Sequence, residues 1–434
     1  MSLKPPESVR KLQTALHAKA KASPTYRFYL LYDKVYRADV LRHAYDRCRS
    51  NGGAPGVDGQ TFEDIESAGV EPWLGELAEK LKSKTYQPEA VLRAWIPKGD
   101  GKQRPLGIPT IADRVVQMAA VLVLEAIFEA DLPPEQYAYR AGRSAHDALG
   151  AVTDLIDQGY TEVVDADLSG YFDTIPHAEL MKSVARRVSD RHMLHLIKMW
   201  LEAAVEETDE QGRKHRTTRN RDEGRGTPQG GVASPLLANL YMRRFVLAWK
   251  SQGHEQRLKA YVVNYADDFV ICTRRGRAEP ALQAVRKIMG TLRLTVNETK
   301  TRICRLPGET FKFLSYTFGR LYSRRTGKAY LGLKPAAKAI QAICAEISER
   351  TDRRTTWQDV REVVRDLNWT LQGWSGYFSV GTVVPAYTTV LKHARRRLRQ
   401  WLCQKHKVRG SGYARFPNVD LHGKLGLHQL RGVG

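Results

Sequence analysis

The clearest candidates for catalytic chemistry in the sequence are two adjacent aspartates. Asp267 and Asp268 follow Tyr265-Ala, and apolar, β-rich arms flank them on both sides. The segment Tyr261–Cys272 therefore predicts a hairpin whose turn carries both carboxylates. Neighbouring carboxylates repel each other and are costly to desolvate, so a buried pair favours a divalent cation as its partner. For the Asp-Asp pair taken alone, a simple polar turn remains an alternative.

A second strand end supplies further aspartates earlier in the chain. The run Glu162–Leu168 alternates like a strand and contains Asp165 and Asp167, which share one face by the period of two. The spacing alone does not choose between them. Two strand ends side by side would hold a pair of Mg²⁺ ions for in-line phosphoryl transfer.

The composition indicates a folded protein with a basic surface. The 434 residues suggest two to four domains at about 150 residues per domain. Lys and Arg number 69 against 47 Asp and Glu, a net charge of +22, which favours a polyanionic partner. No apolar run approaches the roughly 20 residues of a membrane-spanning helix, and no secretory signal is evident. Five scattered cysteines argue against a disulfide framework and predict a reducing, cytoplasmic location.

Hydrophobic periodicity and breaker residues predict the elements that must position these carboxylates. They are amphipathic helices over Ser8–Cys48, a loop at Asn51–Gly59, a helix around Trp73, Leu77 and Leu81, a hairpin over Ala94–Pro109 with its tip at Gly99–Gly101, a buried helix over Ile111–Phe128, helices at Ala281–Leu292 and Ala336–Glu349, and strands near Phe311–Phe318.

The C-terminal region from Leu391 onward is strongly basic, with Asp420 its only acidic residue. Within Tyr387–Leu402 the spacing predicts a helix with one apolar face and arginines on the other. Aromatic residues interleave with the positive charges, which suits contact with nucleic acid. The residues predicted to make this contact are Arg395, Arg396, Arg397, Arg399, Lys405 and Lys407.

A series of motifs in order resembles the bacterial reverse transcriptases encoded by group II introns. The motifs are Gly53-Ala-Pro-Gly-Val-Asp-Gly59, Ile96-Pro-Lys98 with Arg104-Pro-Leu-Gly-Ile-Pro109, Tyr139-Arg-Ala-Gly-Arg-Ser-Ala-His-Asp-Ala148, Ala166-Asp-Leu-Ser-Gly-Tyr-Phe-Asp173, Gly226-Thr-Pro-Gln-Gly-Gly-Val-Ala-Ser-Pro-Leu-Leu237, Tyr265-Ala-Asp-Asp268, Leu294-Thr-Val-Asn-Glu-Thr-Lys-Thr301 and Phe313-Leu-Ser-Tyr-Thr-Phe318. The segment Asn368–Phe378 is similar to their thumb or maturase domain.

The resemblance implies an α+β right-hand polymerase fold, with fingers, a palm with an antiparallel sheet, and a helical thumb. The expected domains are an N-terminal extension and loop (1–60), fingers and palm (61–330), a thumb or maturase domain (331–390) and a basic nucleic-acid-binding tail (391–434). In this family the loop at Asn51–Gly59 would help to cover the template, although a plain linker is an equally ordinary interpretation.

The resemblance also implies the metal site. Asp167 and Asp267 would bind two Mg²⁺ ions, with Mn²⁺ as a substitute, while Asp268 shapes the site and the backbone carbonyl of Leu168 completes one metal shell. The match to Asp-Leu-x-Gly-Tyr-Phe favours Asp167 over Asp165.

Further residues are expected to bind the nucleotide and the template. Lys98 and Arg104 would bind the triphosphate by a point charge and a fork. Phe172 would exclude a 2′-hydroxyl, so that the substrates are dNTPs, and Gln229 would contact the incoming nucleotide or its template partner. By themselves, aromatic residues such as Phe172 are more often part of a core. Arg140 and Arg143 are candidates for contact with template phosphate, and Lys300 lies in a family motif without an assigned role.

The expected function is RNA-directed DNA polymerisation combined with binding of the group II intron RNA, assistance to splicing, and copying of that RNA into DNA at a DNA target. The expected partners are the intron RNA, a template–primer duplex, target DNA and dNTPs, with no membrane and no required protein partner. The absence of Cys-x-x-Cys pairs predicts no zinc-stabilised endonuclease domain. Two alternatives stay open: a domesticated reverse transcriptase in phage defence, CRISPR adaptation or diversity generation, and an RNA-binding maturase without a polymerase role.

Overall fold

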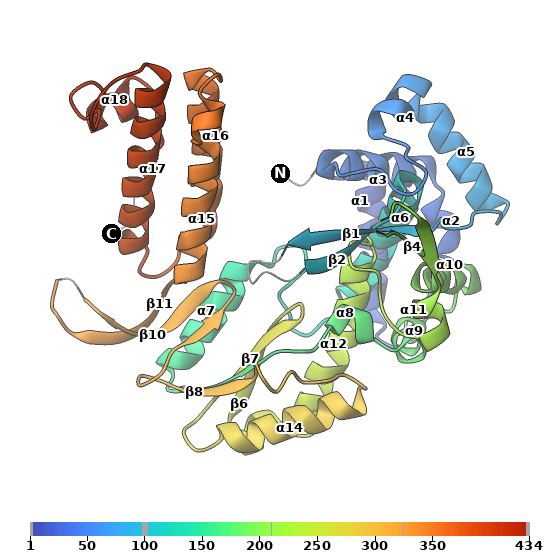
Figure 1. Cartoon of the computed structure of the whole chain (residues 1–434). Helices are drawn as coiled ribbons and strands as arrows, with labels where there is room; N and C mark the ends of the chain where they lie inside the picture. Colours follow the sequence, from blue (N-terminus) through green and yellow to red (C-terminus); the bar gives the residue numbers. More distant parts are fainter. Residues whose placement is uncertain (1–2, 98–102, 210, 324, 431–434) are drawn as a thin grey trace. The chain divides into compact units, whose positions relative to one another are not determined.

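The computed structural model describes residues 3–97, 103–209, 211–323 and 325–430, in two compact units (Figure 1). Unit 1 comprises Met1–Ser144, Ala166–Phe269 and Glu279–Thr301, and unit 2 comprises Ala145–Asp165, Val270–Ala278 and Arg302–Gly434. The candidate carboxylates Asp167, Asp267 and Asp268 all belong to unit 1.

Unit 1 is built around a buried helix, α6 (Ile111–Phe128). The helix begins after Thr110, whose Oγ1 accepts a hydrogen bond from the backbone N–H of Asp113 at 3.1 Å. Because α6 is apolar on nearly all sides, α1 and α3 pack against it. The other helices of this unit are α1 (Glu7–Ala22), α2 (Tyr32–Val35), α3 (Ala38–Asn51), α4 (Phe62–Ala68), α5 (Val70–Lys82), α8 (Tyr171–Thr174), α9 (His177–Ala185), α10 (Arg191–Glu202), α11 (Arg219–Glu223), α12 (Ser234–Ser251), α13 (His254–Leu258) and, but for its first residue, α14 (Ala278–Thr291).

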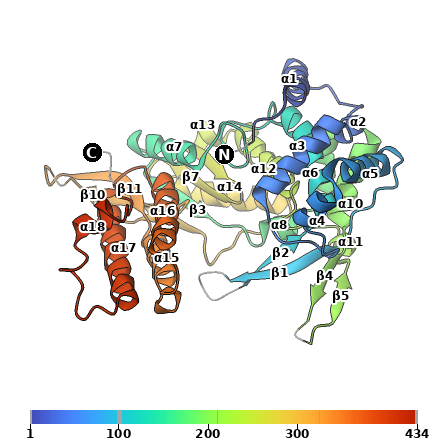
Figure 2. The same cartoon turned by 90° about the horizontal axis from the view of Figure 1, so that it is seen from above.

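A four-stranded sheet of unit 1 carries the predicted N-terminal hairpin (Figure 2). Its order is β2-β1-β4-β5, formed by β2 (Gln103–Ile108), β1 (Val91–Pro97), β4 (Val205–Thr208) and β5 (Lys214–Thr217). Strands β1 and β2 pair antiparallel, which confirms the predicted hairpin. Its predicted tip at Gly99–Gly101 lies outside the described residues, as does Lys98.

A second four-stranded sheet carries the aspartates. Two of the boundaries between the units fall inside its strands β3 and β7. The order is β6-β7-β3-β8, formed by β6 (Ala260–Tyr265), β7 (Asp268–Thr273), β3 (Glu162–Ala166) and β8 (Arg302–Arg305). Strands β3 and β8 are antiparallel, with Asp165 opposite Arg302. The predicted strand over Glu162–Leu168 and the predicted hairpin over Tyr261–Cys272 are therefore confirmed.

Unit 2 contains a small sheet followed by a helical bundle. The sheet has the order β11-β10-β9, and the unit also contains helix α7 (Ala145–Asp157). Its strands are β9 (Phe311–Phe313), β10 (Tyr316–Tyr322) and β11 (Ala329–Pro335). The long helices α15 (Ala337–Arg350), α16 (Val360–Tyr377) and α17 (Val384–Lys405) run side by side, with a short 3₁₀ turn at Arg353–Thr355 and α18 (Asn418–Gly423) completing the bundle (Figures 1 and 2).

The last turn of α16 is tied to two other elements of unit 2. The carbonyl oxygen of Tyr377 accepts hydrogen bonds from His146 Nε2 at 2.6 Å and from the Tyr316 hydroxyl at 2.8 Å. The Tyr377 hydroxyl in turn donates to the carbonyl of Leu314 at 2.9 Å. These contacts satisfy a carbonyl that the helix leaves unpaired, and they fix this end of α16 to α7 and β10.

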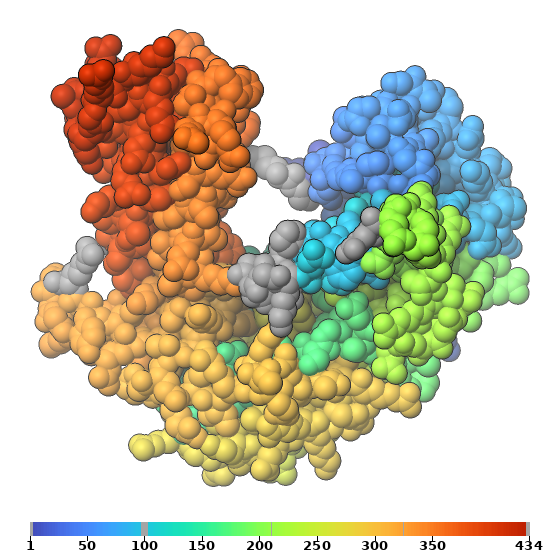
Figure 3. Space-filling view, viewed as in Figure 1, coloured from blue at the N-terminus to red at the C-terminus, as the bar shows by residue number. Residues whose placement is uncertain are grey.

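The expected boundary between a thumb ending at residue 390 and a separate basic tail is wrong. Helix α17 crosses residue 390 without interruption. One hydrophobic core contains Ile347 of α15 and Leu367 of α16 together with Leu398, Trp401 and Leu421 from the supposed tail. Figure 3 shows these helices, in orange and red, as one packed body. The apolar residues of α17 are needed to bury the faces of α15 and α16, so residues 391–430 are part of the bundle.

This packing makes a prediction about Leu398, which is fully buried. We expect Leu398→Ala to lower the free energy of unfolding by about 2–5 kcal/mol, because it leaves a cavity in the shared core. Chemical denaturation checks this, with Gln400→Ala, an exposed position on the same helix, as the control. Equal stabilities of the two variants would contradict the single-core description.

Candidate active site

Asp167 lies directly after β3 and is enclosed by the segment Asn297–Thr301. Its backbone N–H donates to Thr301 Oγ1 at 3.2 Å, and its carbonyl accepts from the backbone N–H of Asn297 at 2.8 Å. Its carboxylate Oδ2 accepts from Asn297 Nδ2 at 3.0 Å and pairs with Lys300 Nζ at 3.2 Å. The side chain is 34% exposed. Asp165, by contrast, pairs at 3.3 Å with Arg302 of the neighbouring strand β8, which supports Asp167 as the site residue.

Asp267 and Asp268 occupy the tight turn between β6 and β7, as predicted. Asp267 is half-buried and Asp268, the first residue of β7, is exposed. The turn residue Ala266 has a φ of +58°, in the left-handed region that is unusual for a residue with a Cβ. The buried Asn264 donates from Nδ2 to the carbonyl oxygens of Ala266 at 2.8 Å and Asp268 at 3.3 Å, and so holds the turn in this conformation.

The charge of Asp267 contributes to raised pKa values of two tyrosines in other motifs, Tyr171 and Tyr139. Burial raises the pKa of Tyr171 well above its usual value, and the nearby Tyr241 and Asp267 add to the effect. Burial raises the pKa of Tyr139, and the charge of Asp267 is the next contribution. Tyr171 follows Asp167 by four residues, so the ends of β3 and the β6–β7 hairpin meet in one region of unit 1.

Carboxylate oxygens have the right chemistry for Mg²⁺, but their side chains are not gathered into a ready cluster. Within the described ranges, no group of three or more His, Cys, Asp or Glu side chains is close enough to hold a metal ion. Carboxylates repel one another, and Asp167 is paired with Lys300. A cation shared by Asp167 and Asp267 would therefore compete with Lys300 for Oδ2 or use the other oxygen.

Arg104 and Gln229, both predicted to bind the nucleotide, are joined by a hydrogen bond. Arg104 Nε donates to Gln229 Oε1 at 3.0 Å, and Gln229 Nε2 donates to Asp173 Oδ2 at 3.1 Å. The backbone of Gln229 also accepts from the N–H of Gly107 at 2.5 Å. The glycine-rich turn is thus docked on β2, and a Cβ at Gly230 would overlap the carbonyl of Gly107. Close packing on β2 explains the glycines here.

Phe172 is buried, with 8% of its surface exposed, in the short helix α8. Its ring meets that of Tyr171 edge-on with centroids 5.6 Å apart, and the Tyr171 hydroxyl donates to the carbonyl of Ala238 at 2.7 Å. The carbonyl of Phe172 accepts from the N–H of Thr227 at 2.7 Å, which joins α8 to the Gln229 turn. Phe172 is therefore a core side chain within the same cluster of motifs as Asp167 and Gln229.

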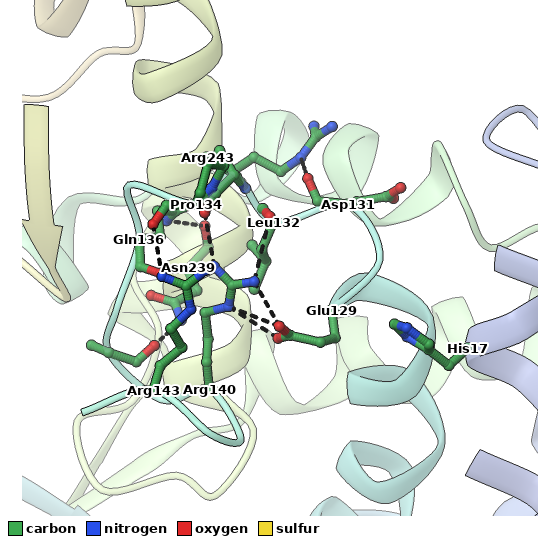
Figure 4. A network of polar contacts seen from close by, with 12 residues as sticks. His17, Glu129, Asp131, Leu132, Pro134, Gln136, Arg140, Arg143, Asn239 and Arg243 are labelled. Carbon is green, nitrogen blue, oxygen red and sulfur yellow. Dashed lines mark hydrogen bonds and ion pairs between the residues drawn. The ribbon is translucent and has the colours of Figure 1, made fainter. Parts of the chain in front are cut away.

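Arg140 does not have the exposed position expected of a residue that contacts template phosphate. Its side chain is 5% exposed. Nε and Nη2 donate to the Glu129 carboxylate, and Nη1 donates to the carbonyls of Pro133 and Gln136, both at 2.8 Å (Figure 4). All its donating nitrogens are thereby used inside the protein. Arg143 is half-buried, donates to the carbonyl of Pro134 at 3.2 Å, and retains a partly open guanidinium.

The basic residues of α17 divide into two groups that the sequence did not distinguish. Arg397 donates to the carbonyls of Ser348 and Thr351 at the end of α15, and Lys405 donates to those of Thr356 and Gln358. Arg399, 1% exposed, bonds to Phe416 and Asn418. These three side chains therefore hold the bundle together. Arg395 is half-buried and bonds to His422, whereas Arg396 and Lys407 are exposed.

Sequence reasoning missed three residues of this region: Asp173, Asn297 and Asn264. Asp173 and Asn297 lie inside motifs that were singled out, and their place in these motifs was the available signal. Asn264 interrupts the apolar strand Val262-Val-Asn-Tyr265, and a buried amide in a strand requires partners. Which partners it finds depends on a segment far away in the sequence, which periodicity does not reveal.

Comparison with known families agrees with this arrangement. Residues 96–318 match the model of the reverse transcriptase (RNA-dependent DNA polymerase) family, and residues 340–416 match that of the group II intron maturase-specific domain. The chain belongs to the group II intron reverse transcriptase/maturase family. A reverse transcriptase domain implies polymerase activity and divalent metal ions, and a maturase domain implies binding of intron RNA. The maturase match runs through residue 390, in agreement with the continuous helix α17.

Several relatives span much of this reverse transcriptase/maturase chain. Protein YkfC from Escherichia coli K12 is 32% identical over 369 residues, covering 76% of this chain and 93% of the relative. The group II intron-encoded protein LtrA from Lactococcus lactis is 31% identical over 297 residues, which is 67% of this chain and 47% of LtrA. The nuclear intron maturase 4 of Arabidopsis thaliana is 26% identical over 216 residues, covering 50% of this chain and 25% of the relative. No helix in the described ranges is both long and apolar enough to span a bilayer.

The position of Arg140 makes a prediction. We expect Arg140→Ala to lower the free energy of unfolding by about 3–5 kcal/mol, because it leaves Glu129 and two carbonyls without their partner. Thermal unfolding checks this, with Arg143→Ala as the control that removes a nearby, more open arginine. A variant that keeps its Tm but loses affinity for a template–primer duplex would restore the phosphate-contact interpretation.

Proposed function

We propose that this chain is an RNA-directed DNA polymerase that binds its group II intron RNA, assists its splicing and copies it into DNA during insertion at a DNA target. The observation that supports this most directly is that Asp167 and the Asp267–Asp268 turn lie at the ends of β3 and β7, which are neighbouring strands of one sheet. Gln229 in turn links Arg104 to Asp173 of the Asp167 motif. The family match over residues 96–318 and the maturase match over residues 340–416 support the combination of copying and RNA binding.

In the proposed active site, Asp167 and Asp267 would hold two divalent ions, with Asp268 adding negative charge and the carbonyl of Leu168 a further oxygen. When bound, Mg²⁺ would lower the pKa of a primer 3′-hydroxyl and stabilise the charge of the triphosphate. Asn297 and Thr301 would keep Asp167 oriented, because they bond to its side chain and backbone. Lys300 would neutralise the carboxylate until a cation replaces it.

Nucleotide binding is proposed for Lys98 and Arg104, with Gln229 and Phe172 shaping the site. Arg104 is exposed, so its guanidinium is accessible to phosphate oxygens, and its bond to Gln229 Oε1 uses only Nε. Gln229 lies between Arg104 and Asp173, where a small shift would change its hydrogen bonds. The backbone carbonyl of Phe172 is bonded to Thr227 beside the same turn, which supports the proposal that Phe172 limits space at the sugar.

Binding of RNA by the maturase region is proposed for the exposed basic residues Arg396 and Lys407, with Arg395 at the edge. Arg143 remains a candidate for contact with template phosphate. Because Arg397, Arg399 and Lys405 are bonded within the bundle, fewer phosphates are expected to be neutralised than the composition suggests. The salt dependence of RNA affinity reports this number.

The polymerase proposal is tested by Asp267→Asn. This change removes one charged ligand of the proposed metal pair, so we expect primer extension on an RNA template to fall by about 10³-fold or more. The affinity for intron RNA, measured by filter binding, should change little, because Asp267 is far in sequence from the maturase domain. Full extension activity in this variant would overturn the polymerase site, and an inactive wild type would favour the RNA-binding maturase without a polymerase role.

The role proposed for Phe172 is tested by sugar selection. We expect Phe172→Ala to raise incorporation of ribonucleotides relative to deoxynucleotides by about 10- to 100-fold, because a steric barrier is removed. Single-nucleotide extension with dNTP and NTP gives the ratio of kcat/KM values. Tyr171→Phe, which retains the neighbouring ring, serves as the control, and an unchanged ratio in Phe172→Ala would remove the assignment.

A further inference from the structure

The hairpin turn that carries Asp267 and Asp268 has a conformation that its own residues do not favour. Ala266 has a φ of +58° although it carries a Cβ. Such conformations persist where surrounding contacts impose them, and they cluster at functional sites. Contacts from other residues must therefore hold the turn in this conformation, and the described hydrogen bonds identify them.

The side chain of Asn264, which is fully buried, makes the first of these contacts. Its Nδ2 donates to the carbonyl oxygens of Ala266 at 2.8 Å and Asp268 at 3.3 Å, which are the residues on either side of Asp267. An asparagine amide provides two donors and one acceptor in a single plane. Its two donors fix two peptide planes, and thereby the direction in which the intervening aspartate leaves the backbone.

The orientation of that amide is set by Gln136, which is also fully buried. Gln136 Nε2 donates to Asn264 Oδ1 at 3.4 Å and to the carbonyl of Asn239 at 3.1 Å. Since Oδ1 is used as the acceptor, Nδ2 must face the turn. Backbone bonds from Asn264 to Glu135 at 2.9 Å and from Tyr137 to Asn264 at 3.0 Å keep the two segments in register.

The contact from Gln136 to Asn264 leaves another polar atom of Gln136 without a partner in the described part of the chain. Its Oε1 is buried and has no hydrogen-bond partner among the residues the structure describes. A buried polar atom without a partner destabilises a fold, and an apolar side chain of similar size would avoid this. A glutamine at this position therefore serves its donor contacts to Asn264 and Asn239.

Arg140 holds the segment that contains Gln136. Its Nη1 donates to the carbonyl oxygens of Pro133 and Gln136, and its other nitrogens bond to Glu129, which directly follows α6 (Figure 4). The buried helix α6 is thus connected to the aspartate turn by a chain of polar contacts, Glu129–Arg140–Gln136–Asn264.

We propose that this chain of contacts sets the conformation of the aspartate turn, and that Asn264 and Gln136 are positioning residues for Asp267 and Asp268. The catalytic consequence rests on the proposed polymerase function, whereas the effect on the turn does not. Neither residue touches the substrates; each acts through the turn.

The experiment uses near-isosteric apolar variants of the full chain. Asn264→Leu should lower kcat for single-nucleotide extension by about 10- to 100-fold, because displacement of a catalytic group by about 1 Å has effects of this size. The KM for dNTP and the Kd for a template–primer duplex should stay close to those of the wild type. Gln136→Met should lower kcat less, and the double variant should be no worse than Asn264→Leu, since both act along one chain of contacts.

Thr273→Val is the matched control. Thr273 is fully buried on β7, at the other end of the same hairpin, and its Oγ1 donates to the carbonyl of Glu162 at 3.0 Å. It should lower Tm by a similar amount and leave kcat unchanged. If Thr273→Val lowers kcat as much as Asn264→Leu does, the loss follows from stability and the proposal is overturned.

Hydrogen exchange separates this proposal from the proposed function. Amides of Ala266–Phe269 should exchange faster in Asn264→Leu and Gln136→Met than in the wild type, whether or not the wild type polymerises. Unchanged exchange in both variants would overturn the positioning role. An inactive wild type with faster exchange in the variants would overturn the polymerase and leave the positioning of the turn intact. If Asn264→Leu does not fold, Gln136→Met provides the same kinetic and exchange measurements.

Discussion

Carboxylates that must act on one substrate repel each other, and the rest of the active-site region is organised around that repulsion. Asp167 and the Asp267–Asp268 turn come from two strand ends. Asp167 is restrained through its backbone and its side chain, and the turn is restrained through its backbone. Restraint through the backbone is independent of charge, so it persists whether or not a cation is near. The buried amide of Asn264 and the segment Asn297–Thr301 are therefore as important to this site as the acids themselves.

Basic side chains have three distinct roles in this protein, although composition counts them together. Lys300 compensates a carboxylate, Arg104 presents an open guanidinium beside Gln229, and Arg397 and Lys405 satisfy carbonyl oxygens where α15 and the following turn end. The last role is one that buried arginine and lysine perform well, because their donors match the unpaired carbonyls at the end of a helix. Part of the positive charge of the C-terminal region consequently serves folding.

Local patterns predicted the elements well and the side-chain partners poorly. The run Ile111–Phe128 is apolar on nearly all sides, which is enough to define a buried helix, and the β6–β7 hairpin follows from apolar arms around Ala266-Asp267. The internal bonding of Arg140 could not be predicted, because its partners Glu129 and Pro133 become apparent only when the intervening loop folds back. The boundary at residue 390 failed for a related reason: a change in charge was taken for a change of domain, while the apolar spacing of α17 continued across it.

The same distinction explains why the carboxylate motifs could be found from sequence while their geometry could not. Motif residues are recognisable because chemistry restricts their type, so Asp167 and Asp267 stand out in one chain. Their separation depends on Asn264 and Gln136, whose types are restricted only by each other and by the carbonyls they meet. A hydrogen-bonded pair of amide side chains produces no hydrophobic periodicity and no charge pattern in the sequence. Precise placement of reacting groups thus depends on residues whose partners the sequence does not reveal. A near-isosteric apolar replacement at these positions separates the presence of the acids from their alignment.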